Sequence, residues 1–210
     1  MRVDPDFWRT VEQTHEYWKD PSVATDVREK YREFCQPEYY LNNREASDMF
    51  LDVVKRWMPD RESTILELGT NVGRNLYYLD MAGYKNIKGV EISSKAVELG
   101  LLSFGDVCAN IEVSSIEDYL IDTTDEFDLV FTMGVLLHIH PDSEWIFDKM
   151  ADVAKKYIIT IENERETMPY KWGRKYEEIF AALGWSQIDN FLFHPLSVTT
   201  TLRMFENGRI

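Results

Sequence analysis

The spacing of hydrophobic positions changes near residue 60 of this chain. Before that point, apolar residues recur at helical spacing in three segments, 7–20, 23–35 and 42–60. Asn43 is placed to cap the third of these helices, and one stripe of it is apolar: Met49, Phe50, Val53, Val54 and Trp57. Residues 1–58 are therefore predicted to be helical.

After residue 63, short apolar runs alternate with segments of helical spacing. Strands are predicted at 64–68, 87–92, 109–113, 127–134 and 156–162, with helices ending at Leu79 and spanning 93–103, 116–120 and 143–154 between them. A helix at 171–184 then precedes two strands in succession, 185–193 and 198–207. The alternation predicts an α/β fold with a parallel sheet covered by helices on both faces. The last two strands predict an antiparallel hairpin at one edge.

Composition and charge narrow the class of protein. A chain of 210 residues with 44% hydrophobic content is expected to form one domain, residues 59–210, with residues 1–58 as a helical cap on it. The formal net charge of −14 disfavours phosphate backbones and acidic membranes, so neither nucleic acid nor a membrane is an expected partner. The N-terminus lacks the apolar core of a signal peptide and no run is long enough to span a membrane, which predicts a cytoplasmic location.

The turn after the first predicted strand, within LELGTNVGRNL, contains the first candidate site. A dinucleotide fingerprint that starts at Gly69 would need glycines at two positions that hold Asn71 and Arg74. A phosphate-binding P-loop is also absent, because no G-K-[ST] follows. What remains is an acidic residue, Glu67, followed by Gly69, Asn71 and Gly73 at every second position.

This arrangement resembles motif I of the class I S-adenosylmethionine-dependent methyltransferases, usually E/D-x-G-x-G-x-G. Asn71 stands in place of the middle glycine, and asparagine tolerates a positive φ better than most residues. The loop is similar to that of a subset that includes methyltransferases associated with pseudaminic acid and related sugar biosynthesis. The resemblance covers roughly residues 60–205. It implies a Rossmann-like fold, a mostly parallel seven-stranded sheet, and S-adenosylmethionine as the cofactor.

The resemblance also implies which residues hold the cofactor. Glu91, at the end of the second predicted strand, is expected to accept hydrogen bonds from both ribose hydroxyls. Ser115 and Ile116 are expected against the adenine, Thr132 to Gly134 beside the methionine part, and Glu67 at its amino group. The full set of candidates is Glu67, Gly69, Asn71, Gly73, Asn75, Glu91, Ile92, Ser115, Ile116, Thr132 and Gly134. Arg44 and Arg74 are further candidates for the cofactor carboxylate, or else surface residues.

A hydroxyl or ammonium acceptor must lose a proton during methyl transfer. His138 is the first candidate for the base because its ordinary pKa lies near neutrality, and Glu162 and Tyr17 are the alternatives. His138 and His140 form an H-x-H pair without a third ligand, so no metal site is predicted, and His140 is expected to face solvent. N-terminal aromatic residues are expected in the core or as walls of a substrate pocket: Trp8, Tyr17, Trp18, Tyr31, Tyr39 and Tyr40.

Three functions remain open from the sequence. The first is a methyltransferase acting on a small polar metabolite such as a sugar or sugar nucleotide. The second is a nicotinamide-dependent oxidoreductase, against which the glycine spacing argues, and the third is a non-catalytic module that kept the cofactor pocket. O-, N- and C-methylation are not distinguished, and the chain is expected to be a monomer or a homodimer.

Overall fold

The structure, a computed structural model, describes residues 9–21, 36–165, 167–168 and 171–208. The helix predicted at 23–35 lies outside these residues, as do Trp8 and Tyr31.

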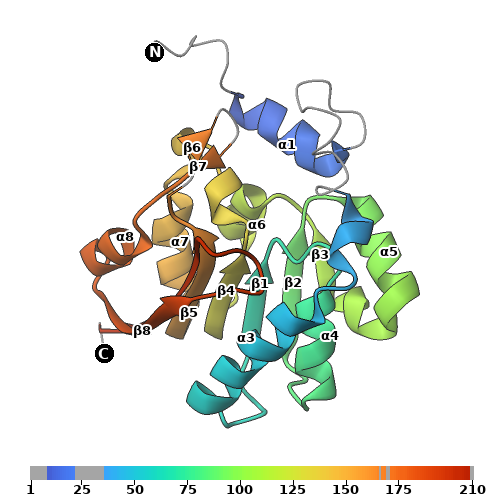
Figure 1. Cartoon of the computed structure of the whole chain (residues 1–210), viewed down its shortest axis with the longest axis horizontal. Coiled ribbons are helices and arrows are strands. Elements are labelled where there is room, and N and C mark those ends of the chain that lie inside the picture. Colours follow the sequence, from blue (N-terminus) through green and yellow to red (C-terminus); the bar gives the residue numbers. More distant parts are fainter. Residues whose placement is uncertain (1–8, 22–35, 166, 169–170, 209–210) are drawn as a thin grey trace.

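A seven-stranded sheet forms the centre of the molecule (Figure 1). Its strands, in spatial order, are β3 (Ile111–Val113), β2 (Ile87–Glu91), β1 (Ile65–Leu68), β4 (Phe127–Met133), β5 (Ala154–Asn163), β9 (Thr200–Asn207) and β8 (Trp185–Leu192). The first five are parallel, whereas β9 runs antiparallel to both β5 and β8. The predicted sheet with an antiparallel edge hairpin is confirmed.

Helices cover both faces of the sheet because neighbouring residues of each strand point to opposite sides. Ile65 packs with α3 (Arg44–Trp57), α4 (Arg74–Met81) and α5 (Ser94–Phe104) in one hydrophobic core. Its neighbour Leu66 belongs to a second core with α6 (Ile116–Asp122), α7 (Ile146–Val153) and α8 (Tyr176–Ala182). The two-core arrangement leaves the carboxyl ends of the parallel strands open for loops.

The N-terminal helices occupy two different places. The helix α3 begins where the sequence predicts, since Asn43 Oδ1 accepts a hydrogen bond from the Ala46 N–H (3.3 Å). The helix α1 (Val11–Lys19) is capped by Thr10, and Figure 1 shows it lying across the end of the sheet where the parallel strands finish. No helix among the described residues is long and apolar enough to cross a membrane.

The predicted helix at 171–184 is wrong in its first part. Residues Lys171–Trp172 instead form β7, which pairs with β6 (Thr167–Met168), and α8 begins only at Tyr176. The reason is Arg174, which is buried and donates to the backbone carbonyls of Leu136, Trp172 and Ile139. These tertiary hydrogen bonds hold the segment in a non-helical conformation.

Short 3-10 turns complete the structure at η4 (Pro37–Tyr40), η5 (Gly105–Asn110), η6 (Leu136–His138) and η7 (Pro141–Ser143). The first residues of the strand predicted at 109–113 belong to η5, and the first residue of the helix predicted at 143–154 belongs to η7.

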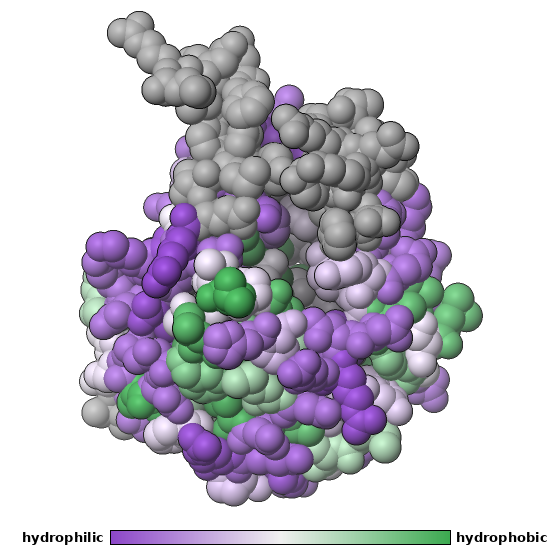
Figure 2. Space-filling model, viewed as in Figure 1, coloured by the Kyte–Doolittle hydropathy of each residue, from purple (hydrophilic) through white to green (hydrophobic). Residues whose placement is uncertain are grey.

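Figure 2 shows hydrophilic residues over most of the visible face, with a hydrophobic group over α5, where Leu101 and Leu102 are exposed.

Candidate active site

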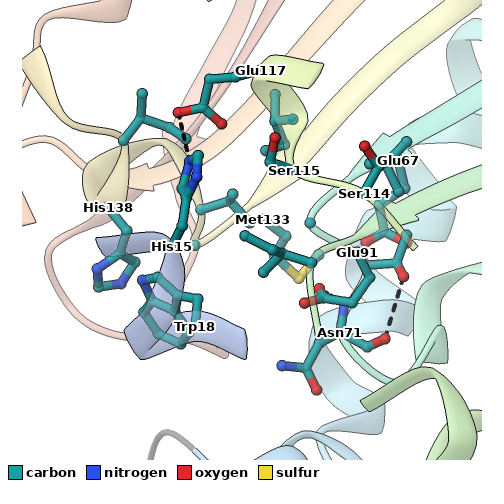
Figure 3. A pocket seen from close by; sticks show the side chains of 18 of the residues that line it. His15, Trp18, Glu67, Asn71, Glu91, Ser114, Ser115, Glu117, Met133 and His138 are labelled. Atoms are coloured by element: carbon teal, nitrogen blue, oxygen red, sulfur yellow. Dashed lines mark hydrogen bonds and ion pairs between the residues drawn. The ribbon is translucent and has the colours of Figure 1, made fainter. Parts of the chain in front are cut away.

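A cleft opens at the carboxyl ends of β1, β2, β3 and β4, and α1 closes one side of it. The empty space of the cleft, counted out through its open mouth into solvent, is about 960 Å³. Figure 3 shows two groups of side chains separated by Met133: the carboxylates Glu67 and Glu91 lie on one side, and His15, Trp18 and His138 on the other.

The turn after β1 has three residues in the left-handed region. Gly69, Asn71 and Gly73 have φ of 76°, 51° and 74°. Asn71 is the only non-glycine residue with positive φ in the described part of the chain, and Val72 N–H donates to its side-chain Oδ1 (3.0 Å). The prediction that asparagine replaces the middle glycine without loss of the turn is confirmed.

Glu91 lies at the end of β2 and is buried. Its Oε2 accepts from the Asn71 N–H (2.7 Å) and its Oε1 from the Ser93 N–H (2.9 Å), so the carboxyl is tied to the turn after β1. Burial raises the pKa of Glu91, and these two N–H donors oppose that rise. Each oxygen keeps a further lone pair for a ligand hydroxyl.

Glu67 is a buried carboxyl with one oxygen unmatched. Its Oε1 accepts from Nδ2 of Asn75 (2.6 Å), while Oε2 is buried and has no hydrogen-bond partner among the described residues. Burial raises the pKa of Glu67 to about 8, although Asn75 and the nearby Arg74 lower it. A ligand ammonium beside Oε2 would satisfy this oxygen and favour the charged carboxylate.

Arg74 connects this carboxyl to the N-terminal helices. Its Nε donates to Oγ of Ser47 on α3 (2.9 Å), and that hydroxyl donates to Oδ1 of Asn75 (2.7 Å). Arg74 is buried and lines the cleft, so it is not a surface residue. Arg44 is exposed and paired with Asp48 (3.1 Å), away from the cleft.

Two candidates on β4 and β5 do not face the cleft. Thr132 is fully buried and donates to Oε1 of Glu162 (2.9 Å). The same oxygen of Glu162 accepts the N–H groups of Val135 (3.0 Å) and Leu136 (3.1 Å). Burial raises the pKa of Glu162 to about 7 against these donors. The carboxyl of Glu162 points at the loop after β4 and holds that loop in place through these hydrogen bonds. The predicted role of Glu162 as a base in contact with the acceptor is therefore wrong.

Tyr17 and Gly73 also lie outside the cleft lining. Tyr17 is buried on another side of α1, where the Arg9 guanidinium lies 3.8 Å from its ring centre, so the alternative role as a base is wrong. A Cβ at Gly73 would approach Ile111 Cδ1 (2.8 Å) and Cys108 Sγ (2.9 Å). Gly73 therefore allows close packing of the turn, and its contact with the cofactor stays a prediction.

The remaining sequence-predicted residues come together in the cleft. They are Glu67, Gly69, Asn71, Asn75, Glu91, Ile92, Ser115, Ile116, Gly134 and His138. Of the N-terminal aromatic residues, Trp18 and Tyr40 line it, whereas Tyr39 is exposed.

The sequence analysis named Trp18 as a possible wall of a substrate pocket but missed the other α1 residues that line the cleft. The face of α1 that lines it consists of Val11, Thr14, His15 and Trp18. Trp18 packs against His138 with ring centres 4.6 Å apart, and His15 Nε2 lies 3.2 Å from Oε1 of Glu117. Helical spacing of these four residues marks a buried face, but nothing local indicates that it covers a cleft.

His140 is also placed differently from its prediction. Its side chain is only 16% exposed, lines the cleft and packs against Trp172 with ring centres 5.2 Å apart. The hairpin of β6 and β7, which the sequence analysis did not predict, brings Trp172 there and reduces the exposure of His140 to solvent.

Residues 65–157 match a family model described as a methyltransferase domain. The matched segment runs from β1 into β5 and includes the loops after β1, β2, β3 and β4 that line the cleft. No curated protein sequence is similar enough to this one to count as a match.

Three solved structures have the same fold over most of this chain. The 1,6-didemethyltoxoflavin-N1-methyltransferase of Burkholderia thailandensis, with bound 1,6-didemethyltoxoflavin and S-adenosylhomocysteine, is 14% identical, has a TM-score of 0.69, and the match covers 99% of this chain and 93% of that one. Magnesium protoporphyrin IX methyltransferase of Synechocystis PCC 6803, with bound SAM, is 15% identical, has a TM-score of 0.66 and matches over 98% of both chains. The N-methyltransferase NodS of Bradyrhizobium japonicum WM9 is 16% identical, has a TM-score of 0.62 and covers 79% of this chain and 96% of its own.

Proposed function

We propose that this protein is a class I S-adenosylmethionine-dependent methyltransferase and that it transfers the methyl group to a small polar acceptor. The match of residues 65–157 to a methyltransferase-domain model and the fold shared with solved methyltransferases support this proposal. The cofactor of this domain is S-adenosylmethionine. The observation that carries the proposal is the pair of buried carboxyls, Glu67 and Glu91, at the left-handed turn of one cleft. One carboxyl is suited to an ammonium group and the other to a pair of hydroxyls, which are the polar groups at the two ends of this cofactor.

The negative net charge of the chain and the position of α1 beside the cleft both favour a small acceptor. The net charge of −14 disfavours nucleic acid, and α1 lines the cleft on the side opposite the two carboxylates. The Burkholderia thailandensis structure holds a small heterocycle. The resemblance of the turn after β1 to sugar-pathway methyltransferases makes sugars and sugar nucleotides the first acceptors to test.

Different residues of the cleft would bind different parts of the cofactor. Glu91 would accept from the ribose hydroxyls, Ser115 and Ile116 would contact the adenine, and Glu67 with Asn75 would hold the amino group. The cofactor supplies a methyl group already activated on a sulfonium. The protein therefore mainly positions the acceptor and excludes water.

Binding of S-adenosylhomocysteine is the first test of this function. Isothermal titration of the full chain is expected to show saturable binding at one site per chain, and NAD should give no heat. Binding of NAD without S-adenosylhomocysteine would favour the oxidoreductase. Binding of S-adenosylhomocysteine, with no methyl transfer to a panel of sugars, sugar nucleotides, amines and phenols, would favour the non-catalytic module.

His138 is the base that we propose for a hydroxyl or ammonium acceptor. It lines the cleft across from the carboxylates, and its ring is held against Trp18. In His138→Ala, turnover should fall about 100-fold, the lower range for loss of a general base, while the S-adenosylhomocysteine dissociation constant should stay within about twofold.

The matched control is His194→Ala, which removes an exposed imidazole outside the cleft and should leave turnover unchanged. Steady-state kinetics with an acceptor from the panel separates kcat from KM. An unchanged kcat in His138→Ala would remove this residue from the proton transfer.

A further inference from the structure

The helix α1 contacts residues in the segments that follow β2, β3 and β4. At its C-terminal end, the Lys19 carbonyl accepts from Oγ of Ser93 (3.1 Å), and Asp20 forms an ion pair with Lys95. Trp18 contacts His138 after β4. All of these loops also supply residues to the cleft, so the position of α1 and the shape of the cofactor site are coupled.

The middle of α1 is held by one ion pair. His15 on α1 and Glu117 in the first turn of α6 lie 3.2 Å apart, and their side chains are 25% and 10% exposed. Glu117 directly follows Ser115 and Ile116, the two residues expected at the adenine. Figure 3 shows His15 and Glu117 side by side in the wall of the cleft, above Trp18 and His138 in that view.

We propose that the His15–Glu117 ion pair is a latch that positions α1 as the outer wall of the cofactor site and retains the bound cofactor. The proposal rests on the proposed function, because it assumes that S-adenosylmethionine and its product occupy this cleft. His15 and Glu117 are positioning residues here, since the pair acts by fixing the inner face of α1.

The charge state of the latch follows from its surroundings. The Glu117 carboxylate raises the pKa of His15, burial opposes this, Asp118 adds to the rise and Lys19 reduces it. Burial would raise the pKa of Glu117, but His15, its own backbone N–H and Ser143 lower it overall.

Two further groups lie near the pair: Glu12 on the preceding turn of α1, whose pKa both His15 and His140 help to lower, and His140 itself in the cleft lining.

The direction of the pH dependence is then determined. The raised pKa of His15 means that the pair is fully charged below the ordinary pKa of a histidine and is lost as pH rises through the raised value. The closed position of α1 is therefore favoured at lower pH. A ligand that binds only the closed form should bind more weakly as His15 loses its proton.

Titration calorimetry with S-adenosylhomocysteine between pH 6 and pH 9 tests this latch in the full chain. Glu67 titrates in the same range, with a pKa of about 8, so the informative quantity is the difference between wild type and Glu117→Gln at each pH. At pH 6 the variant should bind about fivefold more weakly, a size typical of losing one partly exposed ion pair. The two proteins should converge towards pH 9.

A second variant and a second readout separate the latch from a general loss of structure. His15→Gln, on the partly exposed partner, should reproduce the effect at pH 6, and the double variant should be no weaker than either single one. Hydrogen exchange of the α1 amides should be faster in Glu117→Gln, with no change in β1 or β4.

The matched control is Glu16→Gln, the same substitution on an exposed α1 carboxylate that pairs only with Lys19 among the described partners. It should follow the wild type at every pH. Equal affinities of wild type, Glu117→Gln and His15→Gln at pH 6 would refute the latch. Absence of S-adenosylhomocysteine binding to the wild type at all pH values would instead refute the proposed function, and the latch with it.

Discussion

Gly69→Val is expected to eliminate cofactor binding and to lower the free energy of unfolding. Gly69 has φ of 76°, where a β-branched residue is strongly disfavoured, and a Cβ there would lie 2.6 Å from Cγ2 of Val135. The left-handed conformation of a residue with a Cβ should lower the free energy of unfolding by about 1–2 kcal/mol. Overpacking against Val135 should lower it by about 1–3 kcal/mol more. Because the overlap pushes the turn after β1 away from the loop after β4, both sides of the cleft should shift.

Thermal unfolding and titration with S-adenosylhomocysteine measure the two effects of Gly69→Val. Gly83→Val is the matched control, because Gly83 has φ of 96° but a Cβ there would meet only Arg61, at 3.8 Å. The control should lose stability from strain and keep its affinity for S-adenosylhomocysteine. Normal affinity in Gly69→Val would show that the cofactor does not approach this turn closely.

Glu91→Ala is expected to weaken S-adenosylhomocysteine binding by roughly 100-fold. Each hydrogen bond to a charged group contributes about 1.5–3 kcal/mol, and two bonds to the ribose hydroxyls correspond to a change of at least this size. The substitution also removes the acceptor for the Asn71 and Ser93 N–H groups, which loosens the turn after β1.

Glu112→Ala on the adjacent strand is the matched control for Glu91→Ala. Its carboxylate is largely exposed and paired with Lys88 (3.1 Å), so affinity should not change. Glu91→Gln keeps the size and one acceptor oxygen, and should fall between the alanine variant and wild type. An unchanged dissociation constant in Glu91→Ala would exclude this residue from the cofactor site.

The parts of the site that the sequence predicted are those determined by local chemistry. Gly69, Asn71 and Gly73 mark a left-handed turn, because few other residues adopt positive φ at low cost. Glu91 is the last residue of a short apolar run, and the carboxyl ends of parallel strands meet at one edge of a sheet. The turn after β1 and the carboxyl at the end of β2 could be predicted from the sequence for these reasons.

The roles predicted for Tyr17 and Glu162 were wrong because each depended on the direction of one side chain. Consecutive helical residues point about 100° apart, so Trp18 reaches the cleft while Tyr17 packs with Arg9 on another side of α1. Glu162 is at the expected end of β5, but the N–H groups of Val135 and Leu136 in the loop after β4 donate to its carboxyl and hold it away from the cleft.

The sequence by itself determined the seven strands of the main sheet, the left-handed turn and the carboxyl at the end of β2, because each follows from residue preferences within a short segment. Only the tertiary structure brought His15 to Glu117, Trp18 to His138 and Trp172 to His140. These pairs join segments far apart in the chain, and packing of α1 and the β6–β7 hairpin over the end of the sheet decides them. The side of the cleft that holds the turn after β1 and Glu91 is thus determined by local sequence, whereas its opposite wall forms only once the chain has folded.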